Sequence, residues 1–269
     1  MGFETIYAVL PDQAERIGRL QYLLGEQRPP VVSVIGKYNH GKSSLLNALV
    51  EREQFAVSDA RETTVLSAFE HDGIRWLDTP GLDADVEGRD DQEARDGAWL
   101  QSDIRLFVHC VREGEFDQRE KDMIDVLRQD AATSGRQTLI VLTQIEEAED
   151  EVLARILNLI KQQSPGMPVI PVSAHRYLGG LESGSALKVK KSGIRELREA
   201  VQAARHYVEQ VRSDEVLALG EALGGFLDQK LNNLQARLDR LKKTRKSRLA
   251  DFESDYKAMH GKLHSQLKA

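Results

Sequence analysis

The sequence has little cysteine and proline and no long apolar run. Cys110 is the single cysteine among 269 residues, which excludes an internal disulfide and a cysteine metal cluster. No apolar run approaches the roughly 18 residues that a membrane-spanning helix needs. The N-terminus carries Glu4 and no early Lys or Arg, unlike a secretory signal. We expect a cytoplasmic protein in which Cys110 is a buried, small apolar side chain.

Charged residues are plentiful but unevenly distributed. They make up 30% of the chain, with a net charge of −6. Residues 230–269 hold eleven Lys or Arg and four Asp or Glu, a net +7, which leaves −13 for residues 1–229. The basic part of this region, residues 237–248, is either a solvated helix face or a surface for anionic lipid, RNA or an acidic protein. Lipid binding there would place the protein peripherally at a membrane.

Three regions differ in their patterns, and we expect them to be separate domains. Residues 1–29 have apolar side chains at helical spacing, with Pro11 early and Pro29-Pro30 at the expected end. Residues 30–205 alternate short apolar runs with amphipathic stretches, which predicts an α/β fold with a mostly parallel sheet flanked by helices. The runs are Val31–Ile35, Val65–Phe69, Ile74–Leu77, Ile104–Val111, Leu139–Leu142 and Val169–Val172.

Residues 206–269 contain no proline and predict long helices with a coiled-coil seam. The seam has spacings of 4, 3, 4 and 3 residues, slips by one residue, and resumes. Its members are Leu227, Leu231, Leu234, Leu238 and Leu241, then Leu249, Phe252, Tyr256, Met259 and Leu263. A stripe this continuous predicts packing. We favour an intramolecular bundle with the N-terminal helix over pairing between two chains.

A phosphate-binding loop follows the first apolar run. Gly36–Ser43 fits G-x-x-x-x-G-K-[ST] in full, between a strand and a helical pattern. Backbone N–H groups of such a loop point at phosphate oxygens, and the following helix adds its partial positive charge. Lys42 would reach the terminal phosphates, and the Ser43 hydroxyl would hold Mg²⁺.

Three further motifs lie at the positions, relative to the strands, where a nucleoside triphosphatase has its metal-, phosphate- and base-binding residues. Asp78-Thr79-Pro80-Gly81 follows a strand, so that Asp78 can approach Mg²⁺ and the Gly81 N–H can sense a γ-phosphate. Arg61-Glu62-Thr63-Thr64 lies between the phosphate loop and the next strand, where a threonine can close over Mg²⁺. Ser173-Ala174 follows the last strand, where backbone groups can contact a base.

On these residues the chain resembles the translation-factor-related GTPases, in the branch of Era, the tRNA-modification GTPase TrmE and the dynamins. The resemblance covers roughly residues 30–205 and implies a G domain with a six-stranded sheet. It implies catalytic roles for Lys42, Thr64, Gly81 and Asn39, and Mg²⁺ ligation by Ser43, Thr64 and Asp78. It implies that the nucleotide is held by Gly36, Asn39, His40, Gly41, Lys42, Ser43, Ser44, Thr143, Gln144, Glu146, Ser173 and Ala174. We expect the His40 side chain itself to face solvent or a partner.

Two positions concern the attacking water and the ions around it. Leu82 stands where Ras-like proteins carry a water-orienting glutamine. Asn39 matches the position that coordinates K⁺ in potassium-dependent members, and Ser58 and Ala60 align with their carbonyl ligands. K⁺ is therefore a second candidate cofactor beside Mg²⁺. The alternative is that Asn39 only braces the loop.

One motif departs from the family. The guanine-reading Asn/Thr-Lys-x-Asp is replaced by Thr143-Gln144-Ile145-Glu146. Glu146 keeps a bidentate carboxylate on a longer stem, and Gln144 is shorter than lysine. Guanine remains the expected base, with weaker or less selective binding. ATP, mixed specificity, or a nucleotide site with little turnover are the alternatives.

The expected function is a GTPase that hydrolyses GTP with Mg²⁺ and acts as a nucleotide-dependent switch through its helical tail. One alternative is a dynamin-like, membrane-associated GTPase. Another is an assembly GTPase that binds RNA or the ribosome. Homodimerisation through the G domains is a further possibility in each case.

Overall fold

The computed structural model of the chain describes residues 2–55, 67–79 and 98–267. The chain divides into two compact units. The larger unit spans Glu15–Leu219, and the smaller combines Met1–Ala14 with Gly220–Ala269.

The larger unit is built on a six-stranded sheet in the order β2-β3-β1-β4-β5-β6. Strand β2 is antiparallel to β3, and every other neighbouring pair is parallel. The strands are β1 Val31–Gly36, β2 Ser67–His71, β3 Ile74–Asp78, β4 Ile104–Cys110, β5 Gln137–Thr143 and β6 Val169–Pro171. The apolar runs therefore located the strands correctly. Val65 and Leu66, the start of the second run, lie outside the described residues.

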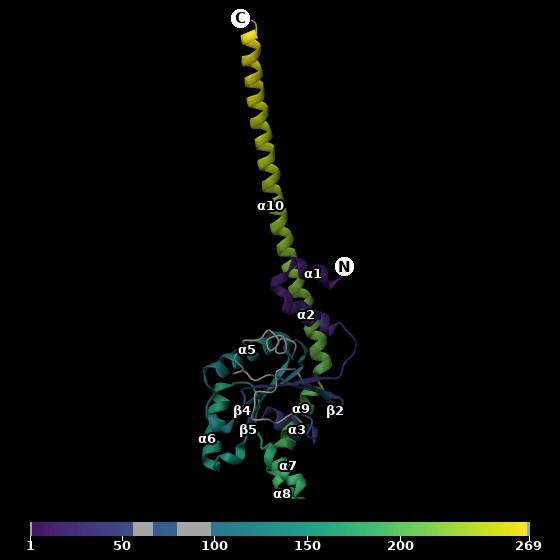
Figure 1. Ribbon diagram of the computed structural model, residues 1–269, viewed down its shortest axis with the longest axis vertical. Coiled ribbons are helices and arrows are strands. Elements are labelled where there is room, and N and C mark those ends of the chain that lie inside the picture. The colour runs from purple at the N-terminus through teal and green to yellow at the C-terminus, as the bar shows by residue number, and fades with distance from the viewer. Residues whose placement is uncertain (1, 56–66, 80–97, 268–269) are drawn as a thin grey trace. The chain divides into compact units, whose positions relative to one another are not determined.

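Helices cover both faces of this sheet (Figure 1). Helices α3 Lys42–Val50, α7 Ala174–Glu182 and α9 Ile194–Arg205 pack on one face, with α8 Ala186–Lys190 beside α7. Helices α5 Gln118–Ser134 and α6 Asp150–Gln163 pack on the other. Alternate residues of β4 serve the two cores: Leu106 and Val108 face the first, and Phe107 the second. Short 3₁₀ turns, η2 Val111–Glu113 and η3 Ile145–Glu147, follow β4 and β5.

The N-terminal region is helical but interrupted. Helix α1 Phe3–Val9 is followed by the 3₁₀ turn η1 Pro11–Gln13 and by α2 Ala14–Leu23. Pro11 therefore divides the helix, as its fixed φ and missing N–H predict. The expected end at Pro29-Pro30 is wrong, because the helix already stops at Leu23. Gly25 stands two residues beyond Leu23, and its N–H donates to the Tyr22 carbonyl in a final tight turn.

The smaller unit contains most of one 60-residue helix, α10 Val208–Leu267. Within this unit the seam residues Leu231, Leu234 and Leu238 are each about half exposed, at 53%, 52% and 50%. Among the described residues, no other segment therefore covers this part of the seam, and the favoured intramolecular bundle is not found there. Helix α1 has seven residues, about 10 Å of helix, and is too short to cover it. Leu10 and Leu223 are buried instead.

The seam changes phase once along α10. Between Leu241 and Leu249 two consecutive steps of four residues meet at Arg245, where the 4-3 spacing elsewhere would bring an apolar residue. Such a stutter locally unwinds a coiled coil. None of the helices in the described residues combines the length and hydropathy needed to cross a membrane.

Candidate functional site

The phosphate loop connects β1 to α3 and depends on glycine at two points. A Cβ on Gly36 would collide with the Val108 carbonyl oxygen on the neighbouring strand. Gly41 has φ +81°, and Asn39 also lies in the left-handed region at φ 58°. Loops with such turns expose successive backbone N–H groups on one side, which creates a concave site for an anion.

The two side chains that the motif assigns to phosphate and metal lie at the start of α3. The Lys42 ammonium donates to the Lys37 carbonyl at 2.8 Å, which holds it against the loop. The Ser43 hydroxyl donates to Asp78 Oδ2 at 2.7 Å. The sheet thus brings together two residues that are 35 positions apart.

Asp78 fits a divalent cation. Its Oδ1 atom is buried and has no hydrogen-bond partner among the described residues. Burial raises the pKa of Asp78, while the Ser43 hydroxyl and the Lys42 charge act in the opposite direction. An unpartnered carboxylate oxygen next to a serine hydroxyl is a suitable oxygen donor set for Mg²⁺.

The end of β5 holds the phosphate loop from the other side. The Thr143 hydroxyl donates to the carbonyls of His40 at 2.7 Å and His109 at 3.1 Å. The Gln144 amide donates to the Asn39 carbonyl at 3.1 Å and accepts from the Cys110 thiol at 3.0 Å. Cys110 is buried as expected. Thr143, which fits the family motif, and Gln144, which departs from it, therefore both brace the loop backbone.

The candidate base-binding residues meet where β5 and β6 end. The Ile145 N–H donates to the Val172 carbonyl at 3.5 Å, which joins the two loops. Glu146 has one buried carboxylate oxygen, Oε2, with no partner in the described part of the chain. Ser173 is fully buried and caps α7 by accepting from the Arg176 N–H at 2.9 Å. Ala174 is the first residue of α7.

The expectation for the His40 side chain is wrong, because it turns inward and is 3% exposed. It packs edge-on against His109, with ring centroids 5.5 Å apart, and its Nδ1 lies 3.4 Å from the Val108 carbonyl oxygen. Burial lowers the pKa of His40. The pattern analysis missed His109 and Glu120, which complete this cluster. His109 shares a sheet face with Phe107, and Glu120 follows Asp117 by the three residues of a capping box.

Several assigned residues cannot be compared with the structure. Thr64 and Gly81 lie outside the described residues, as do Ser58, Ala60 and Leu82. Ser44 lies in α3 and is partly buried. The described part of the site therefore contains the phosphate loop, Asp78 and the two base-side loops.

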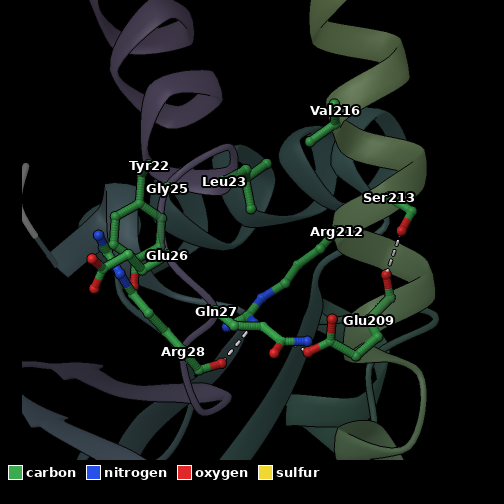
Figure 2. A pocket seen from close by; sticks show the side chains of 10 residues that line it. All are labelled: Tyr22, Leu23, Gly25, Glu26, Gln27, Arg28, Glu209, Arg212, Ser213 and Val216. Atoms are coloured by element: carbon green, nitrogen blue, oxygen red, sulfur yellow. Dashed lines mark hydrogen bonds and ion pairs between the residues drawn. The ribbon is translucent and has the colours of Figure 1, made fainter.

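A separate pocket of about 180 Å³ lies away from the phosphate loop. It is formed by the end of α2, the segment after it and the first turns of α10 (Figure 2). Arg212 extends across it and donates to the Arg28 carbonyl at 2.9 Å and to Glu209 at 3.2 Å. Arg212 is thus held by groups of the pocket itself.

Comparisons with known proteins agree with this geometry. Residues 31–144 match the family described as 50S ribosome-binding GTPase. An uncharacterised protein of Acinetobacter baylyi is 44% identical over 252 residues, which cover 93% of this chain and 60% of that protein. GTPase Era of Bordetella petrii is 29% identical over 156 residues, 55% of this chain and 50% of Era. The chain thus spans 60% of the length of the Acinetobacter protein and 50% of the length of Era.

Two solved structures share the fold. One is Era in complex with MgGDPNP and 16S ribosomal RNA nucleotides, with a TM-score of 0.50, 21% identity, and coverage of 65% of this chain and 56% of that one. The other is an oligomerised bacterial dynamin pair, with a TM-score of 0.56, 18% identity, and coverage of 99% and 51%. The chain therefore contains a P-loop GTPase domain with the G-domain fold, in the region that includes residues 31–144.

Proposed function

We propose that this protein binds guanine nucleotides with Mg²⁺, hydrolyses GTP to GDP and phosphate, and acts as a switch through its helical extension. The observation that carries the proposal is the pair formed by Ser43 and Asp78, with an unpartnered Asp78 oxygen beside it. Bound Mg²⁺ would neutralise charge on the phosphate oxygens. In this proposal residues 30–205 are the GTPase domain, residues 1–29 an N-terminal helix and residues 206–269 the extension.

The chain's own residues then have distinct tasks. Lys42 leaves the Lys37 carbonyl to bind the terminal phosphates, and the loop N–H groups surround them. Ser43, Asp78 and Thr64 hold the metal. The Gly81 N–H contacts the γ-phosphate, and Asn39 binds K⁺ or orders the loop where charge develops between the β- and γ-phosphates.

Guanine is favoured by Glu146. A buried carboxylate oxygen without a partner is costly, and the N1 and N2 donors of guanine would satisfy it. Adenine presents an acceptor at N1 and would leave that oxygen unpaired. Thr143, Gln144, Ser173 and Ala174 form the rest of the base side.

Turnover of GTP and ATP measured side by side tests the proposal. We expect GTP to be preferred, and Glu146→Gln to reduce that preference by about tenfold, since an unpaired base donor costs about 1–3 kcal/mol. Lys42→Ala should abolish nucleotide binding and keep the wild-type circular dichroism spectrum. Lys161→Ala, on α6, is the matched control. Wild-type binding by Lys42→Ala, or faster turnover of ATP, contradicts the proposal.

The extension offers a second level of function. Residues 237–248 are exposed along α10 and strongly basic, so they suit an anionic partner. The structures with the same fold include Era bound to ribosomal RNA and a bacterial dynamin pair that tethers membranes. RNA and anionic lipid are therefore the two candidate partners of this basic segment. Co-sedimentation with anionic vesicles, and filter binding with RNA, each at two salt concentrations, distinguishes them. Lipid binding would place the protein at a membrane surface.

A further inference from the structure

Three buried side chains from separate elements converge behind the phosphate loop. They are His40 of the loop, His109 of β4 and Glu120 of α5, exposed by 3%, 0% and 0%. One ligand atom from each lies within 4.8 Å of the other two. His109 Nδ1 is 2.7 Å from Glu120 Oε1, and His40 Nδ1 is 3.8 Å from the same oxygen. None of these side chains has a task in the proposed GTPase site.

Two imidazoles and a carboxylate are a common ligand set for zinc-like ions. With bonds of about 2.1 Å, the ligand atoms of a tetrahedral ion lie about 3.4 Å apart. The two separations from Glu120 Oε1, 2.7 Å and 3.8 Å, lie on either side of that value. Three protein ligands leave one position for water.

The groups around two of the three side chains, His109 and Glu120, also suit a metal. His109 Nε2 lies 3.2 Å from the Gly114 carbonyl oxygen, so that this nitrogen can carry the proton and leave Nδ1 free to ligate. Glu120 Oε2 accepts from the Asp117 N–H at 3.1 Å. Ligating histidines and carboxylates are usually oriented by such outer hydrogen bonds.

The local charge is negative unless a cation is added. Lys37 is the neighbouring cation, and its ammonium lies 2.8 Å from Asp117, 3.4 Å from Glu120 and 3.8 Å from Glu113. The charges of these four groups, Lys37, Asp117, Glu120 and Glu113, sum to −2, which a divalent ion would offset.

We propose that His40, His109 and Glu120 form a binding site for a divalent transition metal of the zinc type, distinct from the Mg²⁺ site. The ion would join the phosphate loop to β4 and α5. Because the His40 carbonyl also accepts the Thr143 hydroxyl, the ion would fix the loop in the conformation seen here before nucleotide arrives.

Zinc binding by the whole protein, stripped of metal by a chelator and held in excess Mg²⁺ without nucleotide, tests this site. We expect one Zn²⁺ per chain by calorimetry and a rise in the thermal midpoint. Co²⁺ in its place should give the intense visible absorption of a tetrahedral ion with histidine ligands. Glu120→Gln, which keeps the shape of the side chain, should weaken Zn²⁺ binding by about 100-fold or more.

The control is His206→Ala, which removes an exposed histidine from the end of α9. It should bind Zn²⁺ as tightly as wild type. Absence of stoichiometric Zn²⁺ from the wild type overturns the proposal, as does equal weakening by His206→Ala and Glu120→Gln. If Glu120→Gln does not fold, the wild-type Co²⁺ spectrum decides: a tetrahedral spectrum supports the site, and an octahedral or missing one refutes it.

Discussion

Arg19 of α2 and Glu215 of α10 form a two-pronged ion pair inside the larger unit. Arg19 Nε lies 3.0 Å from Oε1 of Glu215, Nη2 lies 2.7 Å from Oε2, and the two residues are each 3% exposed. The third nitrogen, Nη1, donates to the Leu100 carbonyl at 2.7 Å. Leu100 lies in the helical residues 98–101, two residues before β4 begins. The pair and this contact therefore join α2, α10 and the segment that leads into β4.

Removing one partner of this ion pair should lower the stability of the fold substantially. Glu215→Ala leaves a buried guanidinium with half its partners, and we expect a loss of about 3–5 kcal/mol of unfolding free energy in urea. The double variant Arg19→Met, Glu215→Leu should lose less stability than Arg19→Met and Glu215→Leu lose separately when their losses are summed, because neither charge of the pair is left without the other. Arg195→Met, which removes an exposed pair with Glu199, should change stability by less than about 1 kcal/mol. Additive losses would show that the two residues act independently.

The cation dependence of turnover tests Asn39. We expect faster GTP turnover in K⁺ than in Na⁺ at equal ionic strength, and loss of that difference in Asn39→Gly. Glycine is the appropriate substitution because position 39 has φ 58°, which alanine adopts only with strain. Asn39→Asp should keep the preference, since its carboxylate also binds K⁺. Equal rates in the two salts for the wild type would remove K⁺ from the mechanism.

Acid sensitivity should depend on Asp130. Burial by itself would raise the pKa of Asp130, but Arg105 and Arg136 outweigh it and hold the pKa below its usual value. A depressed pKa stabilises the fold above the unfolded pKa of about 3.9, and that contribution is lost as the pH falls through the folded value. Urea unfolding at pH 7 and pH 3 should therefore show a smaller pH-dependent loss in Asp130→Asn than in the wild type.

At pH 7, Asp130→Asn should lower the free energy of unfolding by about 3 kcal/mol, because it leaves two buried guanidinium groups with a weaker partner. Asp125→Asn is the control on the same helix, where the aspartate and its partner Arg128 are each more than half exposed. If Asp125→Asn changed the free energy of unfolding as much as Asp130→Asn does, the stability loss would be general to substitutions on α5.

The exposed seam of α10 should pair between chains. At about 25 cal/mol per Å² of apolar area, leaving it in water costs several kcal/mol. We expect the wild type to be dimeric by light scattering and Leu234→Asp with Leu238→Asp to be monomeric. Asn233→Asp with Ala236→Asp adds the same charge off the seam and should stay dimeric. Monomers throughout, with unchanged thermal midpoints, would show that the seam does not pair chains.

Local patterns predicted the fold well because its elements are defined by neighbours in sequence. The apolar runs located six strands, and the phosphate loop motif placed Ser43 opposite Asp78. What failed depends on contacts between distant residues. The inward turn of His40 requires His109 and Glu120, 69 and 80 positions later, and no local pattern shows that pocket. Likewise, Gln144 looks like a weak substitute for lysine until its bonds to Asn39 and Cys110 are seen.

The phase change at Arg245 restricts what can pair with α10. A partner helix with an uninterrupted seven-residue repeat can match the apolar seam on one side of Arg245. On the other side of Arg245 its apolar residues no longer face the seam. A partner that covers Leu227–Leu263, about 54 Å of helix, must change phase at the matching place. The phase change thus fixes the axial register of the two helices. The two apolar seams face each other in one register and not in shifted ones.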